Sequence, residues 1–327
     1  MSKAKDLIAR QLLGSAFADT YLPPDRTYDD KLVISPEYKE SLPDLQNDLY
    51  EGIRVKIEHV GIHNFKLPLK YDRKDGSKIE LETSVTGTVS LAAANRGVNM
   101  SRIIRTFYEY KDRDFTTELL EDILFAYRKK IGGYDAKIFL SFNYPMIQRS
   151  LRSNMEGYQY YNVTLEFELL EDGTLNRVIH FDFVYSSSCP CSKELTEHAR
   201  KYRNKDGIPH SQRSVARVSV KYNKHIWIED LQSICSRALS TETQVMVLRE
   251  DEQAFAELNG SYPKFVEDAA RLLHKALCQD SRILDFKVVI SHLESLHSHN
   301  AISVITKDVT GGFDSNVSIE ELNSLIR

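Results

Sequence analysis

One order of elements occurs twice along this chain. In the first half, alternating apolar residues predict strands before residue 92, two helical patterns follow Ser101 and Thr116, and two more strands come before residue 170. After the turn Glu171-Asp172-Gly173, the order strand, strand, helix, helix, strand, strand begins again. Little residue identity accompanies the repeat. The pattern therefore predicts an α+β protein built from two tandem units.

The predicted boundaries divide the chain into four parts. Residues 1–50 form an irregular N-terminal arm after a short helix, because prolines interrupt its apolar runs, and we expect the arm to lie over the surface or a neighbouring subunit. The first unit spans 51–172 and the second spans 173–308, which is expected to carry most of the active site. The tail, 309–327, contains a capping-box spacing that predicts a short terminal helix.

Composition narrows the class of protein. A chain of 327 residues that is 42% hydrophobic can bury a large core. Its formal charge of -4 gives no sign of the basic surface that nonspecific nucleic-acid binding requires, so we expect no nucleic-acid partner. No stretch is long and apolar enough to span a membrane. Four cysteines without a disulfide-like framework predict a cytoplasmic protein.

The run from Ser186 to Ser214 contains the most reactive side chains. Cys189-Pro190-Cys191 is too short to close an unstrained disulfide, so both thiols are expected to be free. His210 follows downstream, and a thiolate with a histidine suits either a metal site or a cysteine-based catalytic site. Two cysteines that simply pack at the end of a strand are an equally good interpretation of the spacing alone.

Three further strings supply carboxylates and imidazoles. Arg249–Glu252 is predicted as an acidic loop between two helices, Phe265–Asp268 places carboxylates in a first helical turn, and His292–His299 joins the last two strands. Each has an ordinary explanation, since acidic loops are solvated, such carboxylates complement the helix dipole and histidines in turns are often exposed. Together with Cys189 and His210, they provide the ligand types of zinc, iron or manganese.

These strings, taken together, resemble segments of a known protein family. The strings CPCSKEL, HSQRS, Asp251-Glu252, PKFVED and ESLHSHNA, in this order, are similar to segments of the prokaryotic GTP cyclohydrolase type IB family. Asn99–Arg102 and Leu42–Gln46 are also similar, so the resemblance extends from about residue 42 to 307. It implies the tunnelling fold, with two units of antiparallel sheet carrying helices on one face. It also implies a homotetramer with active sites near subunit interfaces.

The resemblance implies a role for each of several residues. The ligands of a divalent metal (zinc, iron or manganese) would be Cys189, His210 and Glu252. Glu267 would accept hydrogen bonds from the guanine ring, and His297 would be an acid-base group or a further ligand. The positions expected to serve proton transfer or positioning are Cys191, Glu294 and His299.

The implied reaction is hydrolysis of GTP at C8, which gives formate and 7,8-dihydroneopterin triphosphate for folate synthesis. A triphosphate needs cationic donors, and Lys193, Arg213 and Arg102 are our candidates, although each has an equally good interpretation as a surface charge. The segment between Cys191 and His210 is longer than the family pattern and is expected to loop out. Asn99 and His292 also depart from that pattern, which has histidine and asparagine at these positions.

Two alternatives belong beside this interpretation. The same fold could act on another purine or pterin, or form a cyclic phosphate product from GTP. A noncatalytic protein with a structural metal is the second alternative, and its site would be closed by four protein ligands, whereas a catalytic site keeps one position open.

Overall fold

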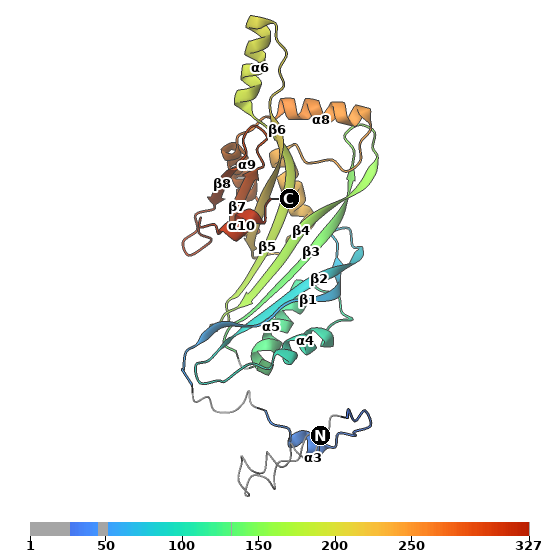
Figure 1. Ribbon diagram of the computed structural model, residues 1–327, viewed down its shortest axis with the longest axis vertical. Coiled ribbons are helices and arrows are strands. Elements are labelled where there is room, and N and C mark those ends of the chain that lie inside the picture. Colours follow the sequence, from blue (N-terminus) through green and yellow to red (C-terminus); the bar gives the residue numbers. More distant parts are fainter. Residues whose placement is uncertain (1–26, 45–51, 132, 327) are drawn as a thin grey trace, which may run out of the picture. The chain divides into compact units, whose positions relative to one another are not determined.

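The computed structural model, shown in Figure 1, describes residues 27–44, 52–131 and 133–326. The chain divides after Leu45 into a short N-terminal part and a large body. Within the described residues, the body contains every strand and every helix longer than five residues. It is therefore the part in which a site can be built on rigid elements.

The N-terminal part contains one short helix, α3 (Pro36–Glu40). Ser35 begins it, because its hydroxyl accepts a hydrogen bond from the amide of Tyr38 at 3.1 Å and Pro36 follows in the first helical position. The helix predicted near the start of the chain lies outside the described residues.

Eight strands form one antiparallel sheet in which the spatial order follows the chain order. The α+β prediction with antiparallel strands is thus confirmed. The strands are β1 (Ile57–Asp72), β2 (Lys78–Leu91), β3 (Ala136–Arg149), β4 (Glu156–Leu169), β5 (Leu175–Ser188), β6 (Ser211–Tyr222), β7 (Ile283–His292) and β8 (Ala301–Thr306).

Strands β4 and β5 join the two repeats into one continuous sheet. Their pairing runs from Val163 opposite Phe181 to the turn that connects them. In that turn Gly173 has a φ of +88°, a conformation that side chains disfavour, which explains the turn predicted from the sequence. The repeat seen in the sequence is therefore a repeat of four strands within one sheet.

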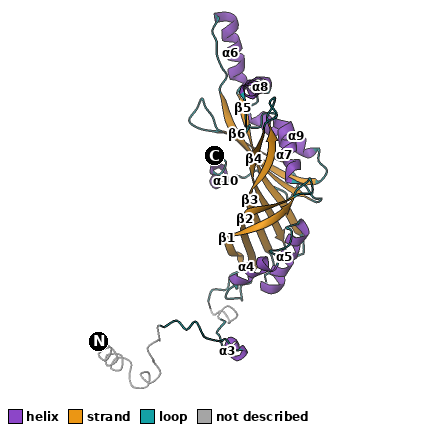
Figure 2. Cartoon of the chain, turned by 90° about the vertical axis from the view of Figure 1, so that its right-hand side faces the viewer, coloured by secondary structure: helices purple, strands orange, loops and turns teal. Residues whose placement is uncertain are grey.

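The helices of the repeat cover one face of the sheet, as Figure 2 shows from the side. They are α4 (Met100–Glu109), α5 (Thr117–Ile131), α7 (Ile228–Leu239) and α9 (Val266–Cys278). Alternate strand residues such as Val218 and Val220 share one buried apolar cluster with Leu231 of α7 and Leu273 of α9. Period-2 strands and period-3.6 helices thus supply the two sides of a single core.

The prediction of an acidic loop at residues 249–252 is wrong, because these residues begin a helix, α8 (Arg249–Ser261). Asp251 stabilises its start. The carboxylate accepts hydrogen bonds from the Leu248 amide at 2.8 Å and from the Arg152 and Ser153 amides at 2.8 Å and 3.0 Å. The β3–β4 hairpin therefore anchors the helix through a fully buried side chain.

The segment after Cys191 also differs from the prediction, since most of it is helical rather than looped. Helix α6 (Pro190–Arg203) begins with proline in its first turn and ends at Asn204, which adopts the left-handed conformation. None of its residues is buried. In Figure 1 the helix extends beyond the end of β5 and β6, which accounts for the extra length in this connection.

The tail crosses to the other face of the sheet (Figure 2). Its predicted terminal helix is present as α10 (Ile319–Asn323), with Ser318 as the cap. Leu325 is fully buried against Val215 and Val289, which point away from the main core. No helix in the described chain is long and apolar enough to cross a membrane.

Candidate functional site

Cys189 and His210 lie beside each other where β5 and β6 meet their connection. Ser188 and Ser211 are paired at the ends of the two strands. One residue further on, the Cys189 amide donates to the His210 carbonyl at 3.1 Å. The pairing of the strands thus brings together two of the three predicted metal ligands.

The Cys189 thiol is half-buried at the start of α6. Its Sγ accepts a hydrogen bond from the Ser192 amide at 3.5 Å, which gives the sulfur a fixed place at the positive end of the helix. Cys191, in the first turn, is exposed. Both cysteines are free, as predicted from their spacing.

One nitrogen of the His210 ring faces two oxygen atoms. Its Nδ1 is 3.1 Å from Oε1 of Gln212 and 3.6 Å from Oε2 of Glu294. Glu294 comes from the β7–β8 connection, which lies at the same end of the antiparallel sheet as the β5–β6 connection. The Leu293 amide donates to the Arg213 carbonyl at 3.1 Å and fixes this connection against β6.

The donors at this end of the sheet fit a borderline divalent metal in chemical type. A thiol, an imidazole and a carboxylate come from Cys189, His210 and Glu294, and Oε2 of Glu294 is buried without a hydrogen bond. Over residues 27–44, 52–131 and 133–326, however, no three such side chains are close enough to hold an ion. The structure therefore shows two possible metal ligands, Cys189 and His210, with the Glu294 carboxylate beside His210.

Glu252 lies elsewhere in the chain. It is exposed in the first turn of α8, at the end of the helix that Asp251 anchors to the β3–β4 hairpin. In the part of the chain that the structure describes, no hydrogen bond or ion pair joins Glu252 to Cys189 or His210. The third predicted ligand is thus not brought to the pair.

Glu267 is exposed in the first turn of α9. The start of this helix is fixed to the end of β5, because the Lys264 amide donates to the Ser188 carbonyl at 3.1 Å. That bond places the helix entrance next to the residue preceding Cys189. Glu267 therefore belongs to the same end of the sheet as the Cys189–His210 pair.

The three predicted phosphate-binding cations are divided between the halves. Lys193 is on α6, with Nζ 3.7 Å from Glu197, and Arg213 is exposed on β6. Arg102 is on α4 in the first half, where its guanidinium donates to the Lys130 carbonyl at 2.8 Å. Two of the three cations therefore flank the pair, and Arg102 does not.

His297 and His299 stack on each other in the β7–β8 connection. Their ring centroids are 4.8 Å apart with an interplanar angle of 11°. Both side chains are exposed. They stand in the same connection as Glu294, so the predicted acid-base groups share one loop with the carboxylate beside His210.

Comparison with known proteins decides the family. The sequence profile described as type I GTP cyclohydrolase FolE2 matches residues 42–303. The chain belongs to this family. GTP cyclohydrolase FolE2 of Dinoroseobacter shibae is 52% identical over 315 residues, covering 94% of this chain and 85% of its own length. The protein of the same name from Paracoccus denitrificans is 52% identical over 289 residues, covering 87% and 90%.

Among solved structures, the FolE2 family member described here has a weak likeness to uricase from Arthrobacter globiformis. The two are 11% identical, with a TM-score of 0.49, over 82% of this chain and 98% of that one. A likeness at this level carries no weight for activity. The assignment to the FolE2 family depends on the sequence comparisons.

A buried polar chain behind His210 was missed at the level of sequence. Gln212 Nε2 donates to Ser187 Oγ at 2.7 Å, Ser187 Oγ is 3.3 Å from His292 Nδ1, and His292 Nε2 is 2.8 Å from the Tyr185 hydroxyl. Burial lowers the pKa of His292 to about 4, so its ring is neutral at pH 7. The available signal was Ser187, a serine that continues the inward face formed by Phe181, Phe183 and Tyr185.

Proposed function

We propose that this FolE2 family member performs its GTP cyclohydrolase reaction at the Cys189–His210 pair. The enzyme hydrolyses GTP at C8, which releases formate and yields 7,8-dihydroneopterin triphosphate for folate synthesis. The observation that carries the location is the bond between the Cys189 amide and the His210 carbonyl, which fixes a thiol and an imidazole at one end of the sheet. As the family resemblance implies, the enzyme is a cytoplasmic homotetramer.

The proposed ligands of the divalent metal, zinc, iron or manganese, are Cys189 and His210, which are hydrogen-bonded neighbours, and Glu252, for which the family resemblance is the only support because it does not lie beside this pair. When bound, such an ion supplies hydroxide near neutral pH by acidifying water, which guanine C8 needs because it is a poor electrophile. The N-cap position of Cys189 and the Gln212 contact to His210 hold the first two donors in place. Fixed donors reduce the entropic cost of assembling the site.

Proton transfers are assigned to the β7–β8 connection and to α6. Opening the imidazole ring of guanine requires protonation of a ring nitrogen, and histidine titrates near the working pH. We assign this role to His297, with His299, Glu294 and Cys191 as the accompanying proton-transfer or positioning groups. The stacking of His297 on His299 and the 3.6 Å approach of Glu294 to His210 support their shared role.

Substrate binding divides between the base and the phosphates. Glu267 accepts hydrogen bonds from the N–H groups of guanine, and a carboxylate at the exposed start of α9 is free to do so. Lys193, Arg213 and Arg102 are assigned to the triphosphate. Lys193 and Arg213 are the better supported, because α6 begins directly after Cys189 and β6 begins directly after His210.

The test is formate release from GTP by metal-free protein that has been reconstituted separately with manganese, iron and zinc. We expect release to require metal and to disappear in Cys189→Ala. Cys278→Ala is the matched control, because Cys278 is also a free cysteine but lies at the end of α9. Equal formate release from Cys189→Ala and the control would overturn the assignment of the site.

A further inference from the structure

A cavity lies away from the Cys189–His210 pair, between the start of α5 and the segment that leads into α7. Its volume is about 460 Å³, within the usual range for small-molecule sites. Ile179 of β5 lines it, whereas Cys189 follows the other end of the same strand. At roughly 3.3 Å per residue, the strand from Ile179 to Ser188 spans about 30 Å. The cavity is therefore separate from the proposed GTP site.

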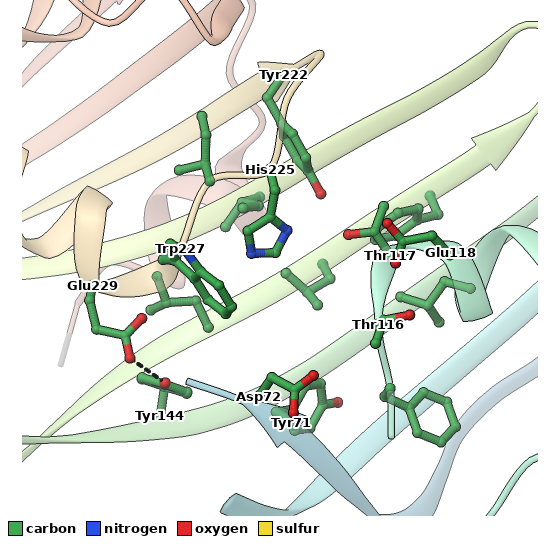
Figure 3. Close-up of a pocket in the computed structure, with 17 residues that line it drawn as sticks. Tyr71, Asp72, Thr116, Thr117, Glu118, Tyr144, Tyr222, His225, Trp227 and Glu229 are labelled. Carbon is green, nitrogen blue, oxygen red and sulfur yellow. Dashed lines mark hydrogen bonds between the residues drawn. The ribbon is translucent and has the colours of Figure 1, made fainter. Parts of the chain in front are cut away.

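Aromatic rings form much of the wall (Figure 3). They are Tyr71, Phe115, Tyr144, Phe167, Tyr222 and Trp227. Flat π-faces favour a planar ligand, and indole and phenol faces attract cations. The wall thus favours a flat molecule that carries a positive charge.

Glu229 offers this ligand an acceptor. Its Oε1 accepts the Tyr144 hydroxyl at 2.7 Å, the contact that Figure 3 draws at one end of the cavity, and it also receives the Lys74 amide at 3.4 Å. Its Oε2 is buried and has no hydrogen-bond partner among the described residues. A buried carboxylate oxygen without a partner carries a desolvation cost that an N–H donor would remove.

The charges that line the cavity are negative. Asp72, Glu118 and Glu229 contribute carboxylates, and none of the described lining residues is lysine or arginine. A backbone hydrogen bond and the Thr116 hydroxyl lower the pKa of Glu118, which keeps it ionised. Burial lowers the pKa of His225, so this ring adds no positive charge at neutral pH.

Cations next to the cavity are engaged by other groups. Lys78 is 3.9 Å from Asp72 but makes its close contact with Asp114. Arg73 lies over the Tyr144 ring, 5.5 Å from its centroid, and donates to the Pro145 carbonyl. The formal charge of the lining residues themselves is therefore negative, from Asp72, Glu118 and Glu229.

We propose that this cavity binds a small planar aromatic cation whose N–H donors meet Glu229, at a site distinct from the GTP site. Aromatic amidines and protonated amino-substituted nitrogen rings belong to this class. Phosphorylated nucleotides do not, because the lining carboxylates repel phosphate. This inference goes beyond the cyclohydrolase reaction and does not depend on it.

The chain provides its own reporter for the test, because Trp227 is its only tryptophan and lines the cavity. Full-length protein labelled with fluorotryptophan is titrated with benzamidine, benzamide and benzoate, which share one ring and differ in charge. We expect a saturable shift of the single fluorine NMR signal with benzamidine, a weaker response to benzamide and none to benzoate. Saturating GTP should leave the benzamidine titration unchanged.

Variants test how much the Glu229 carboxylate contributes to benzamidine binding. Glu229→Gln should weaken benzamidine binding about tenfold, the value of one charge-assisted hydrogen bond. The matched control Asp122→Asn, on the exposed side of α5, should bind as the parent does. Formate release should be unchanged in both variants. If Glu229→Gln does not fold, Glu118→Gln replaces it, with a smaller but measurable loss of affinity.

Four outcomes would overturn the proposal. Benzoate could bind as well as benzamidine, which would make the cavity merely apolar. The carboxylate variants could bind benzamidine with the affinity of the parent, or GTP could displace it from the labelled protein. Absence of any benzamidine response would have the same meaning.

Discussion

The two halves of the sheet share a framework and differ in their connections. In the first half, a short turn at residues 73–77 joins β1 to β2, whereas in the second half α6 stands between β5 and β6. Similarly, α5 follows α4 closely, while α8 separates α7 from α9. Apart from Arg102, every proposed site residue lies in or beside these two connections or in the β7–β8 connection at the same end of the sheet. The same arrangement of strands and helices can thus carry site residues in one half and short turns in the other, because it fixes only the ends of each connection.

The largest effect should come from removing a side chain that only the second half possesses. His210→Ala should lower formate release about a thousandfold, as loss of a group that acts directly at the reacting centre does. His59→Ala, an exposed histidine of β1, is the control from the first half and should retain activity. Steady-state rates of formate release measure both. A comparable loss in the two variants would place chemistry in the first half as well.

The same isoleucine-to-alanine change in the core of each half should lower the free energy of unfolding by the same amount. Ile138 in β3 and Ile290 in β7 are both fully buried in the same apolar cluster. Each change to alanine should lower the free energy of unfolding by about 4 kcal/mol, with a single transition in urea. Circular dichroism follows the transition. Two separated transitions in either variant would mean that the halves unfold independently.

The seam between the halves contains a partly buried ionic contact. Glu166 of β4 is 2.6 Å from Lys137 Nζ and 2.8 Å from His180 Nε2 of β5. Burial alone would raise its pKa, but these two partners lower it to about 2. Because the folded pKa lies below the unfolded value near 4.5, the stabilisation is present above that value and is lost as the pH falls towards 2.

Glu166→Gln should therefore cost about 3 kcal/mol at pH 7 and much less near pH 2. Urea unfolding at several pH values gives the difference between parent and variant. Glu156→Gln is the control, since its contact with Arg149 is exposed. A difference for Glu166→Gln that does not change with pH would show that charge plays no part in the seam.

The smallest effect concerns the tail, which only the second half carries. Ser318 Oγ accepts the Glu321 amide at 3.0 Å and caps α10. Ser318→Ala should lower stability by about 1 kcal/mol without changing formate release. Thermal unfolding measures the first quantity. Ser315→Ala, an exposed serine outside the helix, provides the comparison, and an equal loss there would argue against a specific N-cap.

Periodicity made the framework predictable. Val218 and Val220 alternate because β6 buries one face against helices, and Leu231 and Leu273 recur at helical spacing for the same reason. These patterns depend on neighbours in the sequence. The order of the elements along the chain follows from these patterns, whereas the antiparallel arrangement was expected from the family resemblance and the strand order within the sheet became visible only in the structure.

Residues whose roles depend on distant contacts were not predictable in this way. Asp251 starts α8 only because the Arg152 and Ser153 amides of another hairpin reach it, so the string around it looked like a loop. Glu294 approaches His210 because two connections meet at one end of the sheet. The pairing of Cys189 with His210 was expected from family resemblance, and its backbone geometry became visible only in the structure.

Strand order has a consequence for the way the chain reaches this structure. Since each strand pairs with the strand that precedes it in the sequence, the sheet can lengthen from one end as the polypeptide is synthesised. The loops that must close are short at the tight turns, where little chain entropy is lost. Slower steps are expected at the two helical crossings, β2 to β3 and β6 to β7, where two or more helices must dock before the next strand arrives.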